Sequence, residues 1–190
     1  LENKAVQKEL KFSKTGEFFD EDVEIASEYV KHDGVMPYLV VGPEDPDPNV
    51  EYPVLVYLHG AGEFGTSESA LRGSSMPYVL INGELRDGSD VDLQKFNGYV
   101  LFPQANGSNW TNEGRLQDIH DVLDDFSKTH NIDKSHISLS GHSMGGIGAQ
   151  YFAQHFNDYQ DDYELFKVGV ISGYASSAFD LSKVTIPIRG

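Results

Sequence analysis

The chain has 190 residues, no cysteine and a formal net charge of −16. Disulfide bonds, thiolate catalysis and cysteine-ligated zinc are therefore excluded, and the acidic excess argues against nucleic acid or an anionic membrane surface as a partner. No apolar run reaches the roughly 20 residues that a membrane-spanning helix needs. The length suits one domain over residues 1–190, and a cysteine-free chain fits either the cytosol or, as we slightly prefer, a secreted setting.

Two partly alternating segments near the N-terminus predict a β-hairpin. They cover residues 23–30 and 36–41 and flank a turn signal at 32–34. We expect this hairpin at the edge of a sheet, preceded by an N-terminal extension over residues 1–20. The proline-rich segment 42–49 predicts a stiff exposed loop, because its acidic residues lack the spacing of a calcium-binding loop.

Nearly continuous apolar runs predict strands that are buried on both faces. Pro53–Leu58 and Gly98–Pro103 are two such runs, and their pattern is typical of a parallel sheet covered by helices. Together with the helical segments between them, they predict an α/β fold with helices on both faces of a mostly parallel sheet. Further strands are predicted at 137–139, 166–171 and 184–188, and helices from near Pro77, over 112–130 and over 147–156.

Two groups of aspartates are expected to face solvent. The helix predicted over 112–130 has its apolar residues at helical spacing, which leaves its acidic residues on the opposite face. A second acidic group follows the helix predicted over 147–156. The members are Asp118, Asp121, Asp124 and Asp125 in the first group, and Asp158, Asp161 and Asp162 in the second.

A glycine-rich turn, His59–Gly65, follows the first buried strand. Its three glycines let the backbone approach a ligand closely, and ligands of parallel sheets bind beyond the carboxyl ends of the strands. A phosphate site is disfavoured because the Gly-Lys-Ser/Thr ending of a P-loop is absent. His59 could act as a base, although a structural role at the strand end fits better.

Three side chains are candidates for lining a substrate cleft at this edge. Gln104 and Trp110 lie on the polar loop after the second buried strand, and Tyr174 follows the strand predicted at 166–171. Simple packing is an equal alternative for Trp110. An apolar or aromatic acyl group would suit such a cleft.

The sequence Gly141-His142-Ser143-Met144-Gly145 lies between a predicted strand and a predicted helix, which is the nucleophile elbow pattern. Residues 131–135 predict a turn before that strand. The sharp reversal strains Ser143 and leaves no room for side chains at the two glycine positions. The Ser143 hydroxyl would then stand above the sheet edge, beside the free N–H of Met144. A glycine-rich turn with an incidental serine is the simpler alternative.

These features together resemble the α/β-hydrolase fold. Four segments look like the esterase and predicted-peptidase group, which includes polyhydroxybutyrate depolymerase-like and feruloyl-esterase-like enzymes. The resemblance covers roughly residues 36–190 and is specific for the fold rather than for the substrate. The segments are Leu58–Gly65 (LHGAGEFG), Leu101–Gln104 (LFPQ), Asn131–Gly146 (NIDKSHISLSGHSMGG) and Val184–Gly190 (VTIPIRG).

The resemblance implies hydrolysis of a small-molecule or polymer-linked carboxylic ester through an acyl-enzyme on Ser143. Backbone N–H groups of Met144 and of Ala61, or its neighbours Gly60 and Gly62, would stabilise the oxyanion. No cofactor is implied. No metal site is expected either, because the His, Asp and Glu residues show no ligand-spaced pair on one element.

The remaining triad members do not follow the order of the family, which is Ser, then an acid, then His. The only histidine after Ser143 is His155, about 18 Å along a continuous helix and therefore out of reach. Asp180 is a fallback acid. We therefore expect residues 1–190 to be the front part of a longer catalytic domain, with the acid and the histidine beyond Gly190.

Two alternatives stay open at this point. The same site could hydrolyse peptide bonds, or the chain could be a catalytically silent binding protein on a hydrolase scaffold. The missing base favours silence, whereas the intact Ser143 turn disfavours it, because a strained turn is costly to retain without a use.

Overall fold

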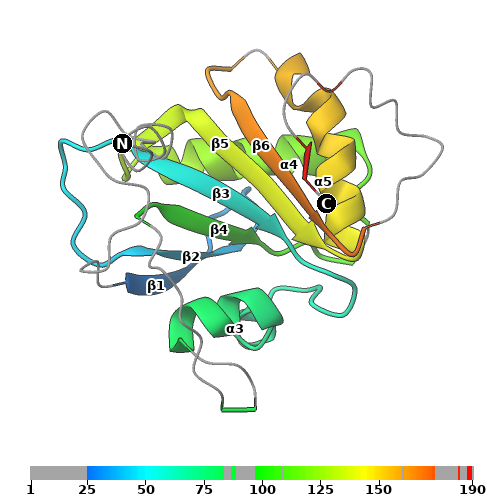
Figure 1. Cartoon of the computed structure of the whole chain (residues 1–190), viewed down its shortest axis with the longest axis horizontal. Coiled ribbons are helices and arrows are strands. Elements are labelled where there is room, and N and C mark those ends of the chain that lie inside the picture. The colour runs from blue at the N-terminus through cyan, green and yellow to red at the C-terminus, as the bar shows by residue number, and fades with distance from the viewer. Residues whose placement is uncertain are drawn as a thin grey trace, which may run out of the picture.

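A mixed sheet with strand order β1-β2-β4-β3-β5-β6-β7 organises the computed structural model (Figure 1). The structure describes residues 25–83, 87–88, 97–107, 109–159, 161–173, 184 and 188–189. The extension predicted over 1–20, the candidates Tyr174 and Asp180, and most of the strand predicted at 184–188 lie outside these ranges. The strands are β1 (Ile25–Val30), β2 (Tyr38–Pro43), β3 (Tyr52–Leu58), β4 (Tyr99–Pro103), β5 (Ile132–His142), β6 (Leu165–Ile171) and β7 (Ile188–Arg189).

The predicted hairpin is present at one edge of the sheet. β1 and β2 pair antiparallel, with Ile25 opposite Pro43, and β2 also pairs antiparallel with β4. From β4 onward every neighbouring pair is parallel. β2 runs two residues into the predicted loop, because Gly42 and Pro43 continue the pairing with β1. Gly42 also packs closely against the Tyr99 ring.

Helices cover both faces of the sheet, as predicted. They are α2 (Glu68–Arg72), α3 (Ser75–Asn82), α4 (Glu113–Ser127), α5 (Met144–His155) and the 3₁₀ turn η1 (Phe156–Asp158). α4 and α5 pack on one face in the larger apolar core, and α2 and α3 pack on the other face in a smaller core. No helix in the described ranges is long and apolar enough to cross a bilayer.

Two element boundaries differ from the prediction. α3 begins at Ser75 rather than at Pro77, which is accommodated because the N–H groups of a first helical turn need no partner. Residues 132–135, predicted as part of a turn, belong to the long strand β5. The turn chemistry persists locally, since Asp133 Oδ1 accepts the Ser135 N–H, and the strand pairing shifts register there.

One aspartate expected in solvent, Asp125, is buried, and another, Asp161, is exposed as expected but bonds to a buried histidine. Asp125 is only 8% exposed and accepts hydrogen bonds from the Tyr38 hydroxyl and the His32 ring. Asp161 bonds to Nδ1 of His120, which is buried under the rings of Phe156 and Tyr159. The helical pattern could not show these roles, because the partners come from distant parts of the chain.

Candidate active site

Ser143 lies at a sharp corner between the end of β5 and the first residue of α5. Its backbone has φ 55° and ψ −117°, a conformation that L-residues rarely adopt. A Cβ on Gly145 would lie 1.9 Å from the Leu58 carbonyl oxygen, and one on Gly141 would collide with the Gly145 backbone. The two glycines are therefore sterically required, as the sequence predicted, and they allow α5 to start directly against the end of β3.

The turn after β3 and the turn after β5 share one rim of the sheet. β3 and β5 are parallel neighbours with Leu58 opposite Gly141. A Cβ on Gly60 would lie 3.0 Å from Nδ1 of His142, so the two turns are in contact. β4, the next strand along the chain, lies on the side of β3 away from β5. The helix after the first turn, α2, and the helix after the second turn, α5, cover opposite faces of the sheet. In open α/β sheets this switch point is where ligands bind.

The reactive groups at this rim are open. Ser143 is partly exposed, and its hydroxyl has no hydrogen-bond partner among the described residues. The Met144 N–H belongs to the first turn of α5, where no helical acceptor precedes it. Ala61 and Gly62 are exposed on the facing turn, and their N–H groups have no acceptor in the described part of the chain.

Gly60 differs from its two neighbours. Its N–H donates to Oε2 of Glu63 at 2.7 Å, so this amide is already occupied. Of the three candidate oxyanion donors on this turn, Gly60 is thus corrected to an occupied amide, and Ala61 and Gly62 stay candidates. Sequence reasoning missed Glu63, and the only signal for it was an acidic residue three positions after the glycine in a tight turn.

Gln104 and Trp110 support the turn from within instead of lining a cleft. Both are fully buried. The Gln104 amide nitrogen donates to the carbonyl oxygens of Glu63 and Ser67, and its Oε1 accepts a hydrogen bond from the Tyr29 hydroxyl. Trp110 Nε1 donates to the His59 carbonyl oxygen at 3.0 Å. The cleft prediction for Gln104 is therefore replaced by a bracing role, and packing is the alternative that holds for Trp110.

His59 is a structural residue, as expected. Its Nδ1 donates to the Gly60 carbonyl oxygen at 2.8 Å, and its Nε2 accepts the Ala105 N–H at 3.1 Å, which fixes a neutral tautomer. Burial lowers the pKa of His59, although the bond to Gly60 and the charge of Glu63 oppose the shift. A neutral ring with both nitrogens engaged cannot take a proton from Ser143.

No other histidine reaches the Ser143 hydroxyl. All seven histidines are described, and the ring of His142, next in sequence, contacts Gly60. The remaining five bond elsewhere: His32 to Asp125, His120 to Asp161, His130 to Phe126, His136 to Asp133 and His155 to Asp158. The described histidines therefore offer no base to the candidate nucleophile Ser143.

A second cluster of Ser, His and Asp lies within β5 and fails as a triad on geometry. Ser135 Oγ donates to Asp133 Oδ1 at 2.6 Å and lies 3.0 Å from His136 Nδ1. The same Nδ1 faces Asp133 Oδ2 at 2.9 Å. A triad needs the acid on one ring nitrogen and the hydroxyl on the other, so this cluster is a local turn.

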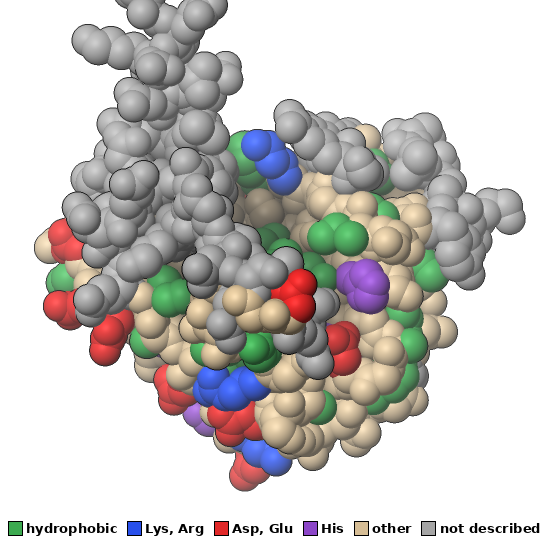
Figure 2. Space-filling view, turned by 60° about the horizontal axis from the view of Figure 1, so that its bottom comes forward, with side chains coloured by type: hydrophobic (Ala, Val, Ile, Leu, Met, Phe, Trp, Pro, Cys, Tyr) green, Lys and Arg blue, Asp and Glu red, His purple; other side chains and the backbone are tan. Residues whose placement is uncertain are grey.

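Acidic side chains predominate over basic ones on the face shown in Figure 2, in keeping with the net charge of −16. Within the described ranges, no three His, Asp or Glu side chains gather closely enough to hold a metal ion.

Comparisons with known proteins were made by sequence and by structure. No protein-family model and no curated protein matches the sequence. Among solved structures, a thermostable esterase aligns with TM-score 0.61 and 25% identity, over 86% of this chain and 44% of that one. The feruloyl esterase module from Clostridium thermocellum aligns with TM-score 0.57 and 19% identity, over 85% of this chain and 59% of that one. An S-formylglutathione hydrolase from Staphylococcus aureus aligns with TM-score 0.56 and 18% identity, over 84% of this chain and 63% of that one.

The chain spans about half the length of these solved structures. The alignments cover most of this chain, and the predicted resemblance is confirmed at the level of the fold. The described residues thus form an α/β-hydrolase fold, and the three solved structures named above are two esterases and an S-formylglutathione hydrolase.

Proposed function

We propose that this protein hydrolyses carboxylic esters, with Ser143 as the nucleophile. One observation carries the proposal: a partly exposed serine without a hydrogen-bond partner is held on a strained corner at a rim that also presents free backbone N–H groups. Strain at such a position is expected where a reactive group must be exposed. The similarity to esterases favours esters as the substrate class.

The proposed reaction proceeds through an acyl-enzyme. Ser143 Oγ attacks the ester carbonyl carbon, and the carbonyl oxygen becomes an oxyanion that accepts hydrogen bonds from the N–H groups of Met144 and Ala61. The alcohol leaves with a proton, and water then attacks the Ser143 ester to release the acid. The net charge of −16 suits neutral or cationic substrates.

The proton of the Ser143 hydroxyl must be taken by a base, and none of the seven histidines is placed to act as one. In serine hydrolases a histidine takes the serine proton and an acid orients that histidine. We place these two groups in a part of the protein outside residues 1–190. The rim around Ser143 would then be completed by that part, including much of the acyl pocket.

Labelling with a fluorophosphonate probe tests the proposal in the whole natural protein. We expect Ser143→Ala to abolish labelling and to lower hydrolysis of p-nitrophenyl esters by roughly 10⁵-fold. Ser135→Ala is the matched control, because Ser135 has Asp133 and His136 beside it but no strained corner. Labelling that survives Ser143→Ala would refute the proposal and favour a silent binding protein.

A further inference from the structure

We propose that Glu63 is a positioning residue for the oxyanion turn. By binding the Gly60 N–H, its carboxylate would fix the backbone orientation that leaves the next N–H, of Ala61, free for the substrate. The proposal rests on the ester hydrolase function proposed above. It adds a residue whose side chain touches no reacting atom.

The contact between Glu63 and Gly60 is strong and local. The N–H of Gly60 lies 2.7 Å from Oε2 of Glu63, a hydrogen bond to an ionised acceptor, which is shorter and stronger than a neutral one. Glu63 is only about one quarter exposed, at 24%, so solvent competes with the bond only in part. The side chain therefore closes the turn from Gly60 to Glu63 into a ring.

The base of this ring is held rigidly. The Glu63 carbonyl oxygen accepts from the buried Gln104 amide at 3.1 Å, and the Gly65 N–H donates to the Ala105 carbonyl oxygen at 3.0 Å. On the other side, Trp110 and the His59 ring hold the strand end. Between these anchors, two side chains bond the backbone of residues 60–62 in the described structure: the His59 ring donates to the Gly60 carbonyl oxygen, and Glu63 accepts the Gly60 N–H. Because the His59 ring is itself fixed by burial, Glu63 is the partly exposed member of this pair that sets the orientation of the Gly60 amide.

Glu63 is not the acid partner of a His59 base. Its Oε2 lies 4.0 Å from His59 Nδ1, beyond hydrogen-bond distance, and that nitrogen already donates to the Gly60 carbonyl oxygen. His59 is buried with only 3% exposure and its Nε2 is also occupied. The carboxylate thus has one strong partner in the described structure, the Gly60 amide.

The test combines kinetics with an amide signal in the whole natural protein. We expect Glu63→Ala to lower kcat for a p-nitrophenyl ester by about 10- to 100-fold with little change in KM, because misdirecting an oxyanion donor weakens the transition state alone. Glu63→Gln keeps an acceptor oxygen and should restore kcat to within about 3-fold of the natural protein. Glu44→Ala, which removes the same charge from an exposed loop at the opposite rim, should leave kcat unchanged.

The amide signal is independent of catalysis. Labelling with ¹³C-carbonyl histidine and ¹⁵N-glycine selects His59–Gly60, the single His-Gly pair of these 190 residues. We expect its amide proton to move upfield and to exchange faster in Glu63→Ala, and to stay near its original position in Glu63→Gln.

Two results would overturn the positioning role. One is an unchanged Gly60 signal with unchanged kcat in Glu63→Ala. The other is an equal loss of kcat in the Gln and Ala variants, which would show that the hydrogen bond is not what matters. If Ser143→Ala retains activity while the Gly60 signal responds as expected, the proposed function fails and the bond to Glu63 stands as a structural fact.

Discussion

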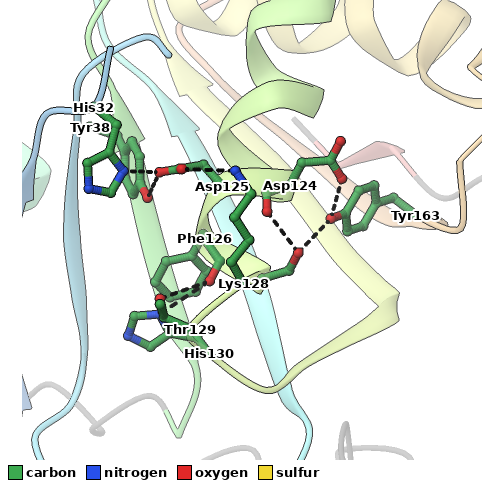
Figure 3. Close-up of polar contacts among 10 residues, drawn as sticks. His32, Tyr38, Asp124, Asp125, Phe126, Lys128, Thr129, His130 and Tyr163 are labelled. Carbon is green, nitrogen blue, oxygen red and sulfur yellow. Dashed lines mark hydrogen bonds and ion pairs between the residues drawn. The ribbon is translucent and has the colours of Figure 1, made fainter. Parts of the chain in front are cut away.

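The rim around Ser143 and the polar cluster at the C-terminal end of α4 differ in whether their polar groups have hydrogen-bond partners. The α4 polar cluster consists of His32, Tyr38, Asp124, Asp125 and Tyr163 (Figure 3). Asp125 accepts from His32 Nδ1 at 2.7 Å and from the Tyr38 hydroxyl at 2.9 Å, and Asp124 accepts from the Tyr163 hydroxyl at 2.9 Å. At the rim, by contrast, the Ser143 hydroxyl and the Ala61 N–H have no acceptor or donor among the described residues.

The difference separates groups that hold the fold from groups that are available for chemistry. In the α4 polar cluster, burial alone would raise the pKa of Asp125, but hydrogen bonds from His32, Tyr38 and Lys128 bring it below its ordinary value. Burial and the bond to Asp125 raise the pKa of Tyr38 far above 10. Because these groups already form hydrogen bonds within the protein, they stabilise one conformation and are poorly suited to bind a ligand.

The largest effect is expected from adding a side chain at the tightly packed glycine beside Ser143. Gly145→Ala places a methyl group 1.9 Å from the Leu58 carbonyl oxygen, and backbone cannot move aside as a side chain can. We expect a loss of about 3 kcal/mol or more in the free energy of unfolding, measured by urea denaturation, together with loss of fluorophosphonate labelling.

Gly114→Ala is the matched control for that substitution. A Cβ there would lie 3.3 Å from the side-chain oxygen of Asn112, and alanine favours the helix. We expect stability to change by less than about 1 kcal/mol. An equal effect of both substitutions would mean that the corner is not especially tight.

The next effect is expected in the α4 polar cluster. Asp125→Ala leaves the buried Tyr38 hydroxyl without its acceptor, which should cost about 2–3 kcal/mol of stability in urea denaturation. Fluorophosphonate labelling at a temperature where the variant is folded should be unchanged. Asp162→Asn, at a carboxylate that is 79% exposed, should cost less than about 0.5 kcal/mol. Loss of labelling in folded Asp125→Ala would show that the two regions are coupled.

The smallest effect is expected from acidification. Burial lowers the pKa of His120 below 6.5, although Asp161, Asp124 and Asp121 pull the other way. As the pH falls, His120 is therefore protonated at a higher pH in the unfolded chain than in the folded chain. The free energy of unfolding should consequently fall as the pH drops from 7.5 to 5.5. Burial also lowers the pKa values of His59 and His130, which adds to the same trend.

The contribution of His120 can be isolated by substitution. His120→Gln should make the pH dependence of the unfolding free energy shallower, whereas His155→Gln, at a side chain that is 37% exposed, should leave it unchanged. An identical pH dependence in His120→Gln and the natural chain would remove His120 from this account.

Local patterns predicted most of the sheet and the Ser143 corner. Apolar runs predicted the central strands because parallel strands are buried on both faces. Gly141 and Gly145 could be read from sequence because the steric requirement is confined to five consecutive residues. The predicted turn over 131–135 was wrong, because Asp133 and Ser135 form a local turn motif inside a strand that tertiary pairing extends.

Contacts between distant residues could not be predicted. The partner of Gln104, Tyr29, is 75 residues away, and the partners of Asp125 are 87 and 93 residues away. No spacing rule connects such pairs, so Gln104 was placed in a cleft and Asp125 in solvent. Glu63 was overlooked for another reason, since a carboxylate in a loop is usually solvated and only coordinates show its bond to Gly60.

The position of Trp110 gives the protein a built-in optical reporter. It is the single tryptophan of the 190 residues, its indole N–H is bonded to the His59 carbonyl oxygen, and its ring meets the His59 ring edge-on with centroids 5.0 Å apart. Its emission therefore originates at the foot of the turn that carries Ala61. A change in the hydration or shape of that turn will shift the emission wavelength without any label being attached.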